Sequence, residues 1–586
     1  NYLTVSAALY VALLWGAYRM LTSENEMEKK TGRTHTVVFV ALILVITALK
    51  VWLSQTFFGH SSDMSLFSAW ADLGRHESVR EFYGPLGAEY FVDYPPLYLY
   101  VLTVIGRLAE LFHISFGSDA YTALIKLVPV LADTVSALVV FKLAYDEFGK
   151  KTAGILSLAL LFNPAYILNS VFWGQIDGLY TLMIFWLIFS VYRKRYFQAA
   201  VAFAVGMLTK PQMIIFLPLL GFWLIYDVIS EFKEEKHFLS LQKFLLGLLA
   251  SAAITVAAAI PIFGLDFGRF FALYKEAAGQ YPYASLNAAN VFGAFGLNWA
   301  DTAGTFLGIS YQSWGFIGII LTSLTIGLGT FFAQNRSGVL ILGGFNILSI
   351  YMLAHTMHER YMFPLILILL VIYIYTRDKR MLFAFGAATV LSFIQTGITL
   401  LDNEGFISFP EQSFIALSWV HIIFFGYMAV VWYKMVIHDD VKLPEMRTPK
   451  IICIEKNGDK VRCTKKDFII VSVLTLAYGV SAFVHLGSMS APETGFRPEA
   501  PGETVILDFG EEQEFDRINF FLGWIDRRDS DSEVERILSV SFGIDPAEGE
   551  ENAELIFGDA TEQVVDSVFN WNGFFAQERG RFMKIT

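Results

Sequence analysis

Residues 361–376 read YMFPLILILLVIYIYT, and residues 36–49 read TVVFVALILVITAL. Both runs are apolar over nearly their whole length, and runs of roughly 17 to 25 such residues match the hydrocarbon thickness of a bilayer. Of the 586 residues, 55% are hydrophobic and 17% are charged, whereas soluble domains carry about 25% charged residues. The mean hydropathy is +0.50. The sequence therefore predicts an integral membrane protein.

Further apolar segments extend this pattern to a mostly α-helical polytopic fold with about 14 transmembrane helices. Spans are expected near 2–21, 35–54, 121–145, 152–172, 178–192, 198–212, 213–230, 240–262, 312–333, 337–356, 361–377, 380–401, 415–435 and 467–486. The segment 97–112 (LYLYVLTVIGRLAELF) is shorter and carries two charges. Hydropathy alone does not decide whether it crosses.

The distribution of Lys and Arg over the loops resolves the topology. If 97–112 stays on one side as a re-entrant or interfacial helix, one set of loops holds 24 Lys and Arg and the other holds 7. The basic set includes 22–34 and 434–466, and the other set includes 55–120 and 263–311. Because cytoplasmic loops carry the excess of Lys and Arg, we predict a multi-pass plasma-membrane protein with 55–120 and 263–311 outside. Residues 1–486 would form this transmembrane domain.

The chain changes character near residue 487. Residues 490–586 hold 22 acids and 8 bases, a net charge of −14, whereas the first 489 residues have a net charge of +2. A linker rich in Pro, Gly and acids is expected at 487–503. Strand-like runs at 504–508, 515–522, 537–542 and 582–585 then predict an extracytoplasmic β-sandwich over 504–586, which we expect to be cut short. Nothing resembles a nucleic-acid surface.

The first polar motif of the outer loops lies in 55–96. Phe67 and Trp70 follow Asp63 at helical spacing, which is typical of an amphipathic helix on the membrane surface. Asp93 and Tyr94 then belong to a chain reversal, DYPP, that starts the next helix. Each of the two acids has an alternative interpretation as a helix N-cap.

Two more outer motifs are WGQIDG (173–178) and KPQ (210–212). The first favours a pocket floor over a tight turn, because a turn alone needs neither Trp nor Gln. The second places Lys210 at the outer end of a helix, where it either serves a functional site or reaches to the lipid headgroups.

The fourth motif is HTMHERY (355–361). Its two histidines are three residues apart and could share a helix face, but no third ligand and no HExxH motif accompany them, so a divalent metal is not indicated. Arg360 is better suited to pairing with an anion such as phosphate, which it binds by fork-shaped hydrogen bonding. Cys453 and Cys463 fall in a cytoplasmic loop, where free thiols are expected and metal or redox chemistry is the weaker alternative.

The order of these motifs resembles the GT-C glycosyltransferase superfamily. The matching stretches are Asp63, DYPPL (93–97), IKLVPVLADTVSALVV (125–140), NPAYILNSVFWGQIDG (163–178), KPQ (210–212) and HERY (358–361). They look most like the endoplasmic-reticulum glucosyltransferases that extend the dolichyl-linked oligosaccharide, and like bacterial mannosyltransferase-like relatives. The resemblance covers about 55–376. Those eukaryotic enzymes carry His-Phe-Gln where this chain has 173–175, and His-Glu-Lys where it has 358–360.

The resemblance implies an inverting transferase, embedded in membrane lipid, that moves mannose or glucose from a polyprenyl-phosphate sugar. No cofactor beyond this donor is certain, and a divalent metal is left open although it is not indicated. The acceptor would be a hydroxyl of a lipid-linked glycan, a cell-surface polymer or a protein on the outer face. Asp63 would be the general base, and Lys210 and Arg360 would face the departing phosphate. The other implied substrate-binding residues are Asp93, Tyr94, Gln175, Asp177, Gln212, His358 and Glu359.

Residues 504–586 resemble a discoidin-type, galactose-binding-like domain, which implies binding of glycan or cell-wall polymer; a structural role is the alternative. Two other functions remain open for the whole chain. It could be a transporter or flippase of lipid-linked glycan, because intramembrane polar residues also line transport pathways, or an inactive binding scaffold. The sequence has no apparent internal inverted repeat of the kind found in transporters.

Overall fold

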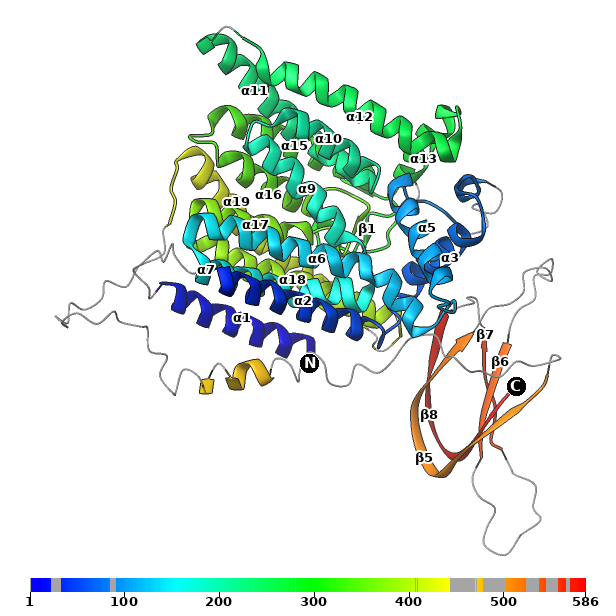
Figure 1. Cartoon of the computed structure of the whole chain (residues 1–586). Coiled ribbons are helices and arrows are strands. Elements are labelled where there is room, and N and C mark those ends of the chain that lie inside the picture. The colour runs from blue at the N-terminus through cyan, green and yellow to red at the C-terminus, as the bar shows by residue number, and fades with distance from the viewer. Residues whose placement is uncertain are drawn as a thin grey trace, which may run out of the picture.

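The computed structural model describes residues 2–22, 33–84, 91–235, 237–279, 281–405, 407, 409–442, 469–470, 472–477, 502–522, 537–543, 557–564 and 570–586. Cys453, Cys463 and the linker up to residue 501 lie outside these residues. Figure 1 shows most helices packed side by side in one bundle, and strands β5 to β8 as a C-terminal sheet.

The first half of the bundle contains α1 (Tyr2–Thr22), α2 (Arg33–Ser54), α3 (Ser61–His76), η1 (Val79–Tyr83), α5 (Pro96–Leu111), α6 (Asp119–Phe148), α7 (Lys150–Leu161), α8 (Pro164–Ile167), η2 (Leu168–Trp173), α9 (Asp177–Tyr192), α10 (Tyr196–Met207) and η3 (Pro211–Phe216). The second half contains α11 (Leu217–Glu235), α12 (Leu239–Phe263), α13 (Phe267–Gly279), α14 (Val291–Ala294), α15 (Tyr311–Phe332), α16 (Gly338–Leu353), α17 (Pro364–Thr376), α18 (Lys379–Asn403) and α19 (Glu411–Ile437). Short strands β1 (Ser285–Leu286), β2 (Thr305–Phe306), β3 (Ile309–Ser310) and β4 (Met357–His358) lie in the loops.

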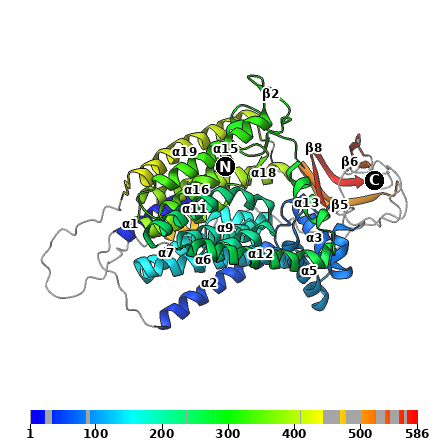
Figure 2. The same ribbon diagram turned by 90° about the horizontal axis from the view of Figure 1, so that it is seen from above.

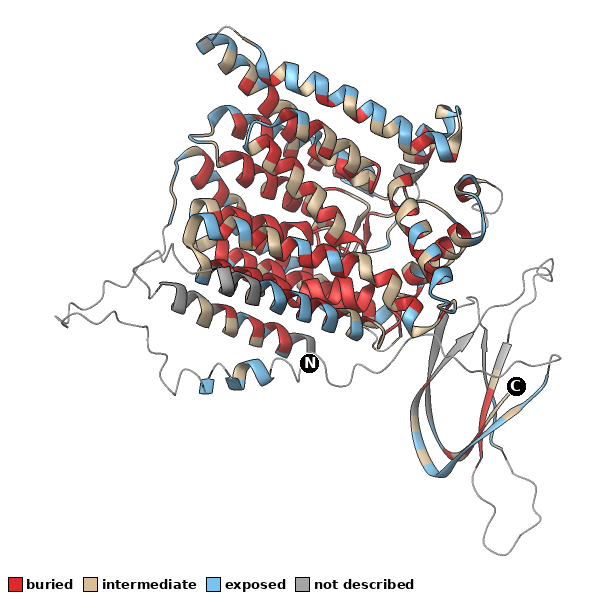
Figure 3. Ribbon diagram, in the orientation of Figure 1, coloured by how far each residue is buried: buried red, intermediate tan, exposed pale blue. Residues whose placement is uncertain are grey.

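Helix α17, which begins inside the run 361–376, lies at the centre of the bundle. All of its residues from Pro364 to Ile374 are buried, as expected of a helix that is hydrophobic on every side. Figure 3 shows the same contrast across the molecule, with buried residues inside and exposed ones on outer helices such as α12. Exposed leucines on α12 and α15, for example Leu249 and Leu328, suit contact with lipid rather than water.

Six helical segments of the described residues are long and apolar enough to cross a membrane: α6, the η3–α11 unit, α12, α15, α18 and α19. A seventh segment joins α7 to the continuous unit of α8 and η2, and the two parts are bent by 43° where they meet. It is a seventh span only if both parts count as one. The bend falls where 152–172 was expected to be continuous. It follows from Pro164, which cannot continue a helix, and from Asn163, whose side chain starts a new one by accepting bonds from the N–H groups of Ala165 and Tyr166. The larger number of spans stays a prediction.

The two ends of the bundle differ in charge. Helices α9, α16 and α17 each connect one end to the other. Their basic loops, which hold Arg193, Arg336 and Arg377, therefore lie at one end, and the polar motifs lie at the opposite end. Figures 1 and 2 both place α3, α5 and α13 together near the polar-motif end. The assignment of this end to the outside stays a prediction.

Helix α3 is the amphipathic helix that the sequence predicts, and it buries Phe67 and Trp70. The capping interpretation of Asp63 is wrong, because His60 is the N-cap and Asp63 is the third helical residue. The capping interpretation of Asp93 is also wrong, since α5 begins after Pro95 without any side-chain cap. At 16 residues, α5 is about 24 Å long, which is shorter than the hydrocarbon core of roughly 30 Å.

The C-terminal sheet has four antiparallel strands in the order β5-β8-β6-β7. Strand β5 (Val505–Leu522) joins two runs that were expected as separate strands, and its pairing with β8 (Asn570–Ile585) shifts register at two irregularities. Strand β6 (Ile537–Gly543) was expected, whereas β7 (Thr561–Val564) and the first part of β8 were not. The described residues of the C-terminal region (502–586) form one sheet. The second sheet of a sandwich therefore stays a prediction.

A buried ion pair joins α2 to α6. The Nζ of Lys50 lies 2.8 Å from the Oδ2 of Asp133, and both side chains are almost inaccessible. Ser170 of η2 donates its hydroxyl to the same carboxylate oxygen.

We expect Lys50→Met to destabilise the fold by about 3–5 kcal/mol, because it leaves the Asp133 carboxylate buried without its cation. Thermal unfolding of the purified protein in detergent measures the change. The double variant Lys50→Met with Asp133→Leu is the control, since it removes both charges and should recover most of the loss. A double variant as unstable as the single one would contradict this account.

Candidate functional site

Four segments meet at the end of the bundle opposite the basic loops: the start of α3, the turn after η2, the turn before η3 and the loop before α17. The carboxylate of Asp63 lies where the first two meet. Its Oδ2 accepts hydrogen bonds from Trp173 Nε1 at 2.7 Å and from Gln175 Nε2 at 2.9 Å. The WGQIDG motif therefore contacts Asp63 directly, although Asp63 and Trp173 are 110 residues apart in the sequence.

Two glycines allow the start of α3 and the turn after η2 to approach so closely. Gly59 has φ +121°, and a Cβ there would lie 2.4 Å from the carbonyl oxygen of Trp173. Gly174 has φ +90°, and a Cβ there would lie 2.3 Å from the sulfur of Met64. Positive φ and lack of space both exclude side chains. In addition, η2 is a π-helix, a rare conformation that is frequent at functional sites.

The start of α3 is also held from the end of α18. The imidazole of His60 stacks on Trp173 with ring centroids 4.6 Å apart and planes 2° apart. The Nδ2 of Asn403 lies 2.9 Å from the Nε2 of His60. The backbone N–H of Ser61 donates to Glu404 Oε1 at 2.7 Å. Asp63 thus projects from a helix end that two other segments, the ends of η2 and α18, fix in place.

Asp63 belongs to a group of five ionisable side chains, which we call the charge cluster: Asp63, Asp177, Lys210, Glu359 and Arg360. Lys210 Nζ lies 2.6 Å from Asp177 Oδ1. Arg360 Nη1 lies 2.6 Å from Glu359 Oε1, and its Nη2 lies 3.9 Å from Asp63 Oδ2. Its Nε lies 3.6 Å from Asp177 Oδ2. One guanidinium therefore connects all three carboxylates, and it also lies over the ring of Trp173.

The charge cluster keeps Asp63 ionised. Burial by itself would raise the pKa of the Asp63 carboxyl and is the largest single influence, but the Arg360 guanidinium and the other groups around the carboxylate together outweigh it and hold this pKa well below its usual range. The hydrogen bonds from Trp173 and Gln175 act in the same direction. In contrast, burial raises the pKa of the Glu359 carboxyl in spite of its contact with Arg360. Asp63 is therefore the more readily ionised of these two acids.

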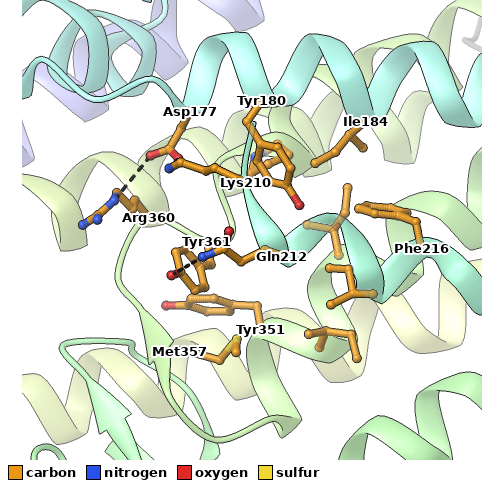
Figure 4. A pocket seen from close by; sticks show the side chains of 14 residues that line it. Asp177, Tyr180, Ile184, Lys210, Gln212, Phe216, Tyr351, Met357, Arg360 and Tyr361 are labelled. Atoms are coloured by element: carbon orange, nitrogen blue, oxygen red, sulfur yellow. Dashed lines mark hydrogen bonds and ion pairs between the residues drawn. The ribbon is translucent and has the colours of Figure 1, made fainter. Parts of the chain in front are cut away.

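A pocket opens beside the charge cluster. It is lined by Asp177, Tyr180, Ile184, Lys210, Gln212, Ile215, Phe216, Ile347, Ile350, Tyr351, Met357, Arg360, Tyr361 and Pro364. Figure 4 shows that Asp177, Lys210 and Arg360 lie together at one end of it, whereas Ile184 and Phe216 lie at the other. Gln212 donates from Nε2 to the Tyr361 hydroxyl at 2.9 Å between these ends. The pocket is therefore polar at one end and apolar at the other.

Tyr94 and Gln175 contact the charge cluster and are not part of the pocket lining. The Tyr94 hydroxyl donates to Gln175 Oε1 at 3.3 Å, and Lys210 Nζ lies over the Tyr94 ring. Burial, with the carboxylates of Asp63 and Asp93 nearby, raises the pKa of the Tyr94 hydroxyl. Asp93 thus belongs to the same electrostatic environment.

His358 lies in β4, which pairs in parallel with β1, and not on a helix as the spacing of the two histidines allowed. Its ring contacts those of Tyr281 and Tyr361. Burial, with the charge of Arg360 nearby, lowers the pKa of His358 to about 3, so the ring is neutral at pH 7. Within the described residues, no group of three or more His, Cys, Asp or Glu side chains is arranged to hold a metal ion.

Sequence reasoning singled out the charge cluster but missed His60, Tyr361 and Glu404. It quoted Trp173 within a motif without giving it a role. Tyr361 is the last residue of the HERY motif and His60 precedes Asp63 by three residues, so membership of a motif or closeness to one was the available signal. Glu404 gives no such signal, because its contact is with a backbone N–H 343 residues away.

Comparison with known proteins agrees with the resemblance read from the motifs. The chain is 23% identical over 203 residues to a dolichyl pyrophosphate Glc1Man9GlcNAc2 alpha-1,3-glucosyltransferase from Mus musculus, covering 32% of this chain and 38% of the relative. It is 22% identical over 251 residues to the enzyme of the same name from Bos taurus, covering 40% of this chain and 47% of the relative. The matches thus span less than half the length of each relative. No family model matches the chain. These similarities support a membrane glycosyltransferase in general terms.

We expect Gly174→Ala to destabilise the protein by more than about 1 kcal/mol, because alanine is strained at positive φ and its Cβ has no room. Thermal unfolding in detergent measures the change. Gly221→Ala on α11 is the matched control, since a Cβ there meets nothing within 4 Å and alanine favours a helix by up to about 1 kcal/mol. Equal melting temperatures for the two variants would argue against the close approach at Gly174.

Proposed function

We propose that this protein is an inverting hexosyltransferase that takes mannose or glucose from a polyprenyl-phosphate sugar. The acceptor is a hydroxyl of a lipid-linked glycan, a cell-surface polymer or a protein, and the reaction takes place on the outer face of the membrane. The observation that carries the proposal is the ionised Asp63 carboxylate, which faces two cations beside a pocket with a polar and an apolar end. The similarity to lipid-linked-oligosaccharide glucosyltransferases supports the same reaction class.

Asp63 serves as the general base in this proposal. The acceptor hydroxyl attacks the anomeric carbon, the bond from that carbon to the phosphate oxygen breaks, and the hydroxyl proton passes to the carboxylate. A phosphate needs no strong acid to leave, so one carboxylate suffices where glycosidases use two. The Asp63 side chain keeps 20% of its surface accessible, which leaves an approach for the acceptor. Trp173 and Gln175 both bond to Oδ2, so Oδ1 is the oxygen we assign to the proton.

Lys210 and Arg360 receive the departing phosphate. Each is already paired with carboxylates, so a bound phosphate has to compete with Asp177 and Glu359 for these cations. The Arg360 Nε has no hydrogen-bond partner among the described residues, so its N–H can donate to a bound phosphate. The higher pKa of Glu359 helps in this exchange, because a protonated Glu359 releases the guanidinium without leaving a buried charge.

The pocket matches the two-part chemistry of such a donor. Its polar end, with Asp177, Lys210 and Gln212, suits the hydroxyls and phosphate of a sugar headgroup. Its apolar end, with Ile184, Ile215 and Phe216, suits the first units of a hydrocarbon chain. The expected lipid-linked donor and glycan acceptor are thus the partners that the site fits best, and residues 504–586 would bind glycan near it.

The decisive experiment is a transfer assay on the purified protein in liposomes with polyprenyl-phosphate mannose and polyprenyl-phosphate glucose. We expect Asp63→Asn to lower kcat by at least about 100-fold, since a general base contributes roughly that much or more, while donor binding and thermal stability persist. The matched control is Asp72→Asn on the same helix, whose carboxylate pairs with Arg75 and His76 outside the charge cluster.

Full activity of Asp63→Asn would overturn the assignment of the base. Movement of a lipid-linked glycan across the liposome membrane, without transfer of sugar from either donor, would instead favour the transporter alternative.

The pH profile tests the pairing of Asp63 with Arg360. The base acts only when ionised, and its lowered pKa places the acid limb of kcat/KM below the usual range of an aspartate. Removing the guanidinium in Arg360→Gln raises the pKa of Asp63, so the acid limb moves to higher pH by about 1–3 units. Rates from pH 4 to 8 at constant ionic strength measure this, with exposed Arg80→Gln as control. An acid limb that stays in place would contradict the pairing.

A further inference from the structure

Lys126 is a buried lysine that the proposed reaction does not use. It lies on α6, and it has 0% exposed surface. Its Nζ is surrounded by backbone carbonyls: it donates to Ser54 O at 3.3 Å and Phe57 O at 2.5 Å on one side, and to Val171 O at 2.9 Å and Phe172 O at 3.3 Å on the other. Burying the amino group of a lysine without hydrogen-bond partners would be strongly unfavourable. The four carbonyls provide these partners, and we therefore ask what the lysine does for the segments that carry them.

Three of these carbonyls belong to the ends of two helices, and the fourth, that of Phe57, lies in the segment between α2 and α3. Ser54 ends α2, and Val171 and Phe172 lie in the last turn of η2, where carbonyls have no partner within the helix. The next carbonyl, that of Trp173, accepts from the backbone N–H of His60 at 3.2 Å. Lys126 and His60 together therefore satisfy the last three carbonyls of η2, and both tie η2 to the segment that leads into α3.

The chain directly after these carbonyls carries the donors to Asp63. Gly174 packs on the lysine so closely that a Cβ there would lie 3.2 Å from Lys126 Cε. The N–H groups of Gly174 and Gln175 bond back to Asn169 O, at 3.1 and 3.0 Å, which closes the turn. The Lys126 side chain thus lies between the turn and the segment that leads into α3 and holds the two together, alongside the bond from His60 to Trp173.

We propose that Lys126 is a positioning residue, which locks the turn 173–175 against the start of α3 and so fixes the donors of Trp173 and Gln175 on Asp63. It touches no reacting atom. Its structural role stands on the hydrogen bonds alone, whereas its effect on turnover rests on the proposed function. A methionine has a similar length but no N–H groups, and it would leave four carbonyls of the two segments without their donor.

Hydrogen exchange tests the structural role without any substrate. In Lys126→Met we expect faster exchange of the backbone amides of 168–176 and 57–64 than in the wild type, read by mass spectrometry of the full chain in lipid nanodiscs. Tyr196→Phe is the matched control, because it removes a buried hydrogen bond to Asp227 near the basic end. Should Lys126→Met not fold, Lys126→Gln keeps two N–H donors and is expected to show a smaller increase. The proposal is overturned if the variant that folds exchanges the backbone amides of these two segments at the same rate as the wild type.

The catalytic consequence is a split between kcat and KM. Misplacing a catalytic group by about 1 Å costs up to about 100-fold in rate, so we expect Lys126→Met to lower kcat by roughly 10- to 100-fold. The KM for the polyprenyl-phosphate sugar should change by less than about threefold, because the cations that would hold the phosphate are on other segments. A loss confined to KM contradicts the role assigned to Lys126.

A double-mutant cycle separates positioning from general damage. If Lys126 acts through Trp173, Lys126→Met lowers kcat much less in a Trp173→Phe background than in the wild type. If the two substitutions damage the protein independently, their fold-losses in kcat multiply. Multiplicative effects overturn the proposal. If the wild type transfers no sugar from either donor, the proposed function fails, and the exchange measurement still decides the role of Lys126.

Discussion

The ionised carboxylate of Asp63, at the edge of a largely apolar helix bundle, is the constraint on which the rest of the site depends. A carboxylate removed from water is costly unless donors and a counter-charge replace its hydration. Here the donors come from the turn after η2 and the counter-charge from the loop before α17. Three segments that are far apart in sequence must therefore converge, and Gly59, Gly174 and the π-helix are the local means of this convergence.

The charge cluster has three acids and two bases, so it lacks one positive charge when every member is ionised. Arg360 bridges the acids, and none of the three therefore has it alone. Such an arrangement holds cations ready in an apolar setting while the site contains no anionic ligand. In the proposed reaction, a phosphate that enters replaces one carboxylate at the guanidinium, and Glu359, whose pKa is raised by burial, can give way by taking up a proton.

Hydropathy and charge predicted the helical fold and the gathering of the polar motifs at one end, since both follow from the bilayer. The bend at 162–163 was not predicted, although Asn163 and Pro164 form a helix start that the sequence displays. Other features depend on tertiary contacts. The alternative interpretation of Asp63 and Asp93 as helix caps was wrong because Asp and Pro patterns do not reveal which residue begins a helix. The task of Lys126 was beyond prediction, since its partners are backbone carbonyls 45 to 72 residues away and leave no pattern of side chains.

Three residues of this chain differ from the eukaryotic glucosyltransferase motifs: Trp173, Gly174 and Arg360. Two of them, Trp173 and Arg360, are groups next to Asp63. Position 173 carries Trp where those enzymes have His, and position 360 carries Arg where they have Lys. An indole N–H only donates and does not titrate, so the 2.7 Å bond from Trp173 holds Asp63 at any working pH. A guanidinium presents several donors in one plane, which lets Arg360 reach three carboxylates where an ammonium offers a single point of charge. These two departures therefore act together: both strengthen the hold on one carboxylate, and they leave its position in the chain unchanged.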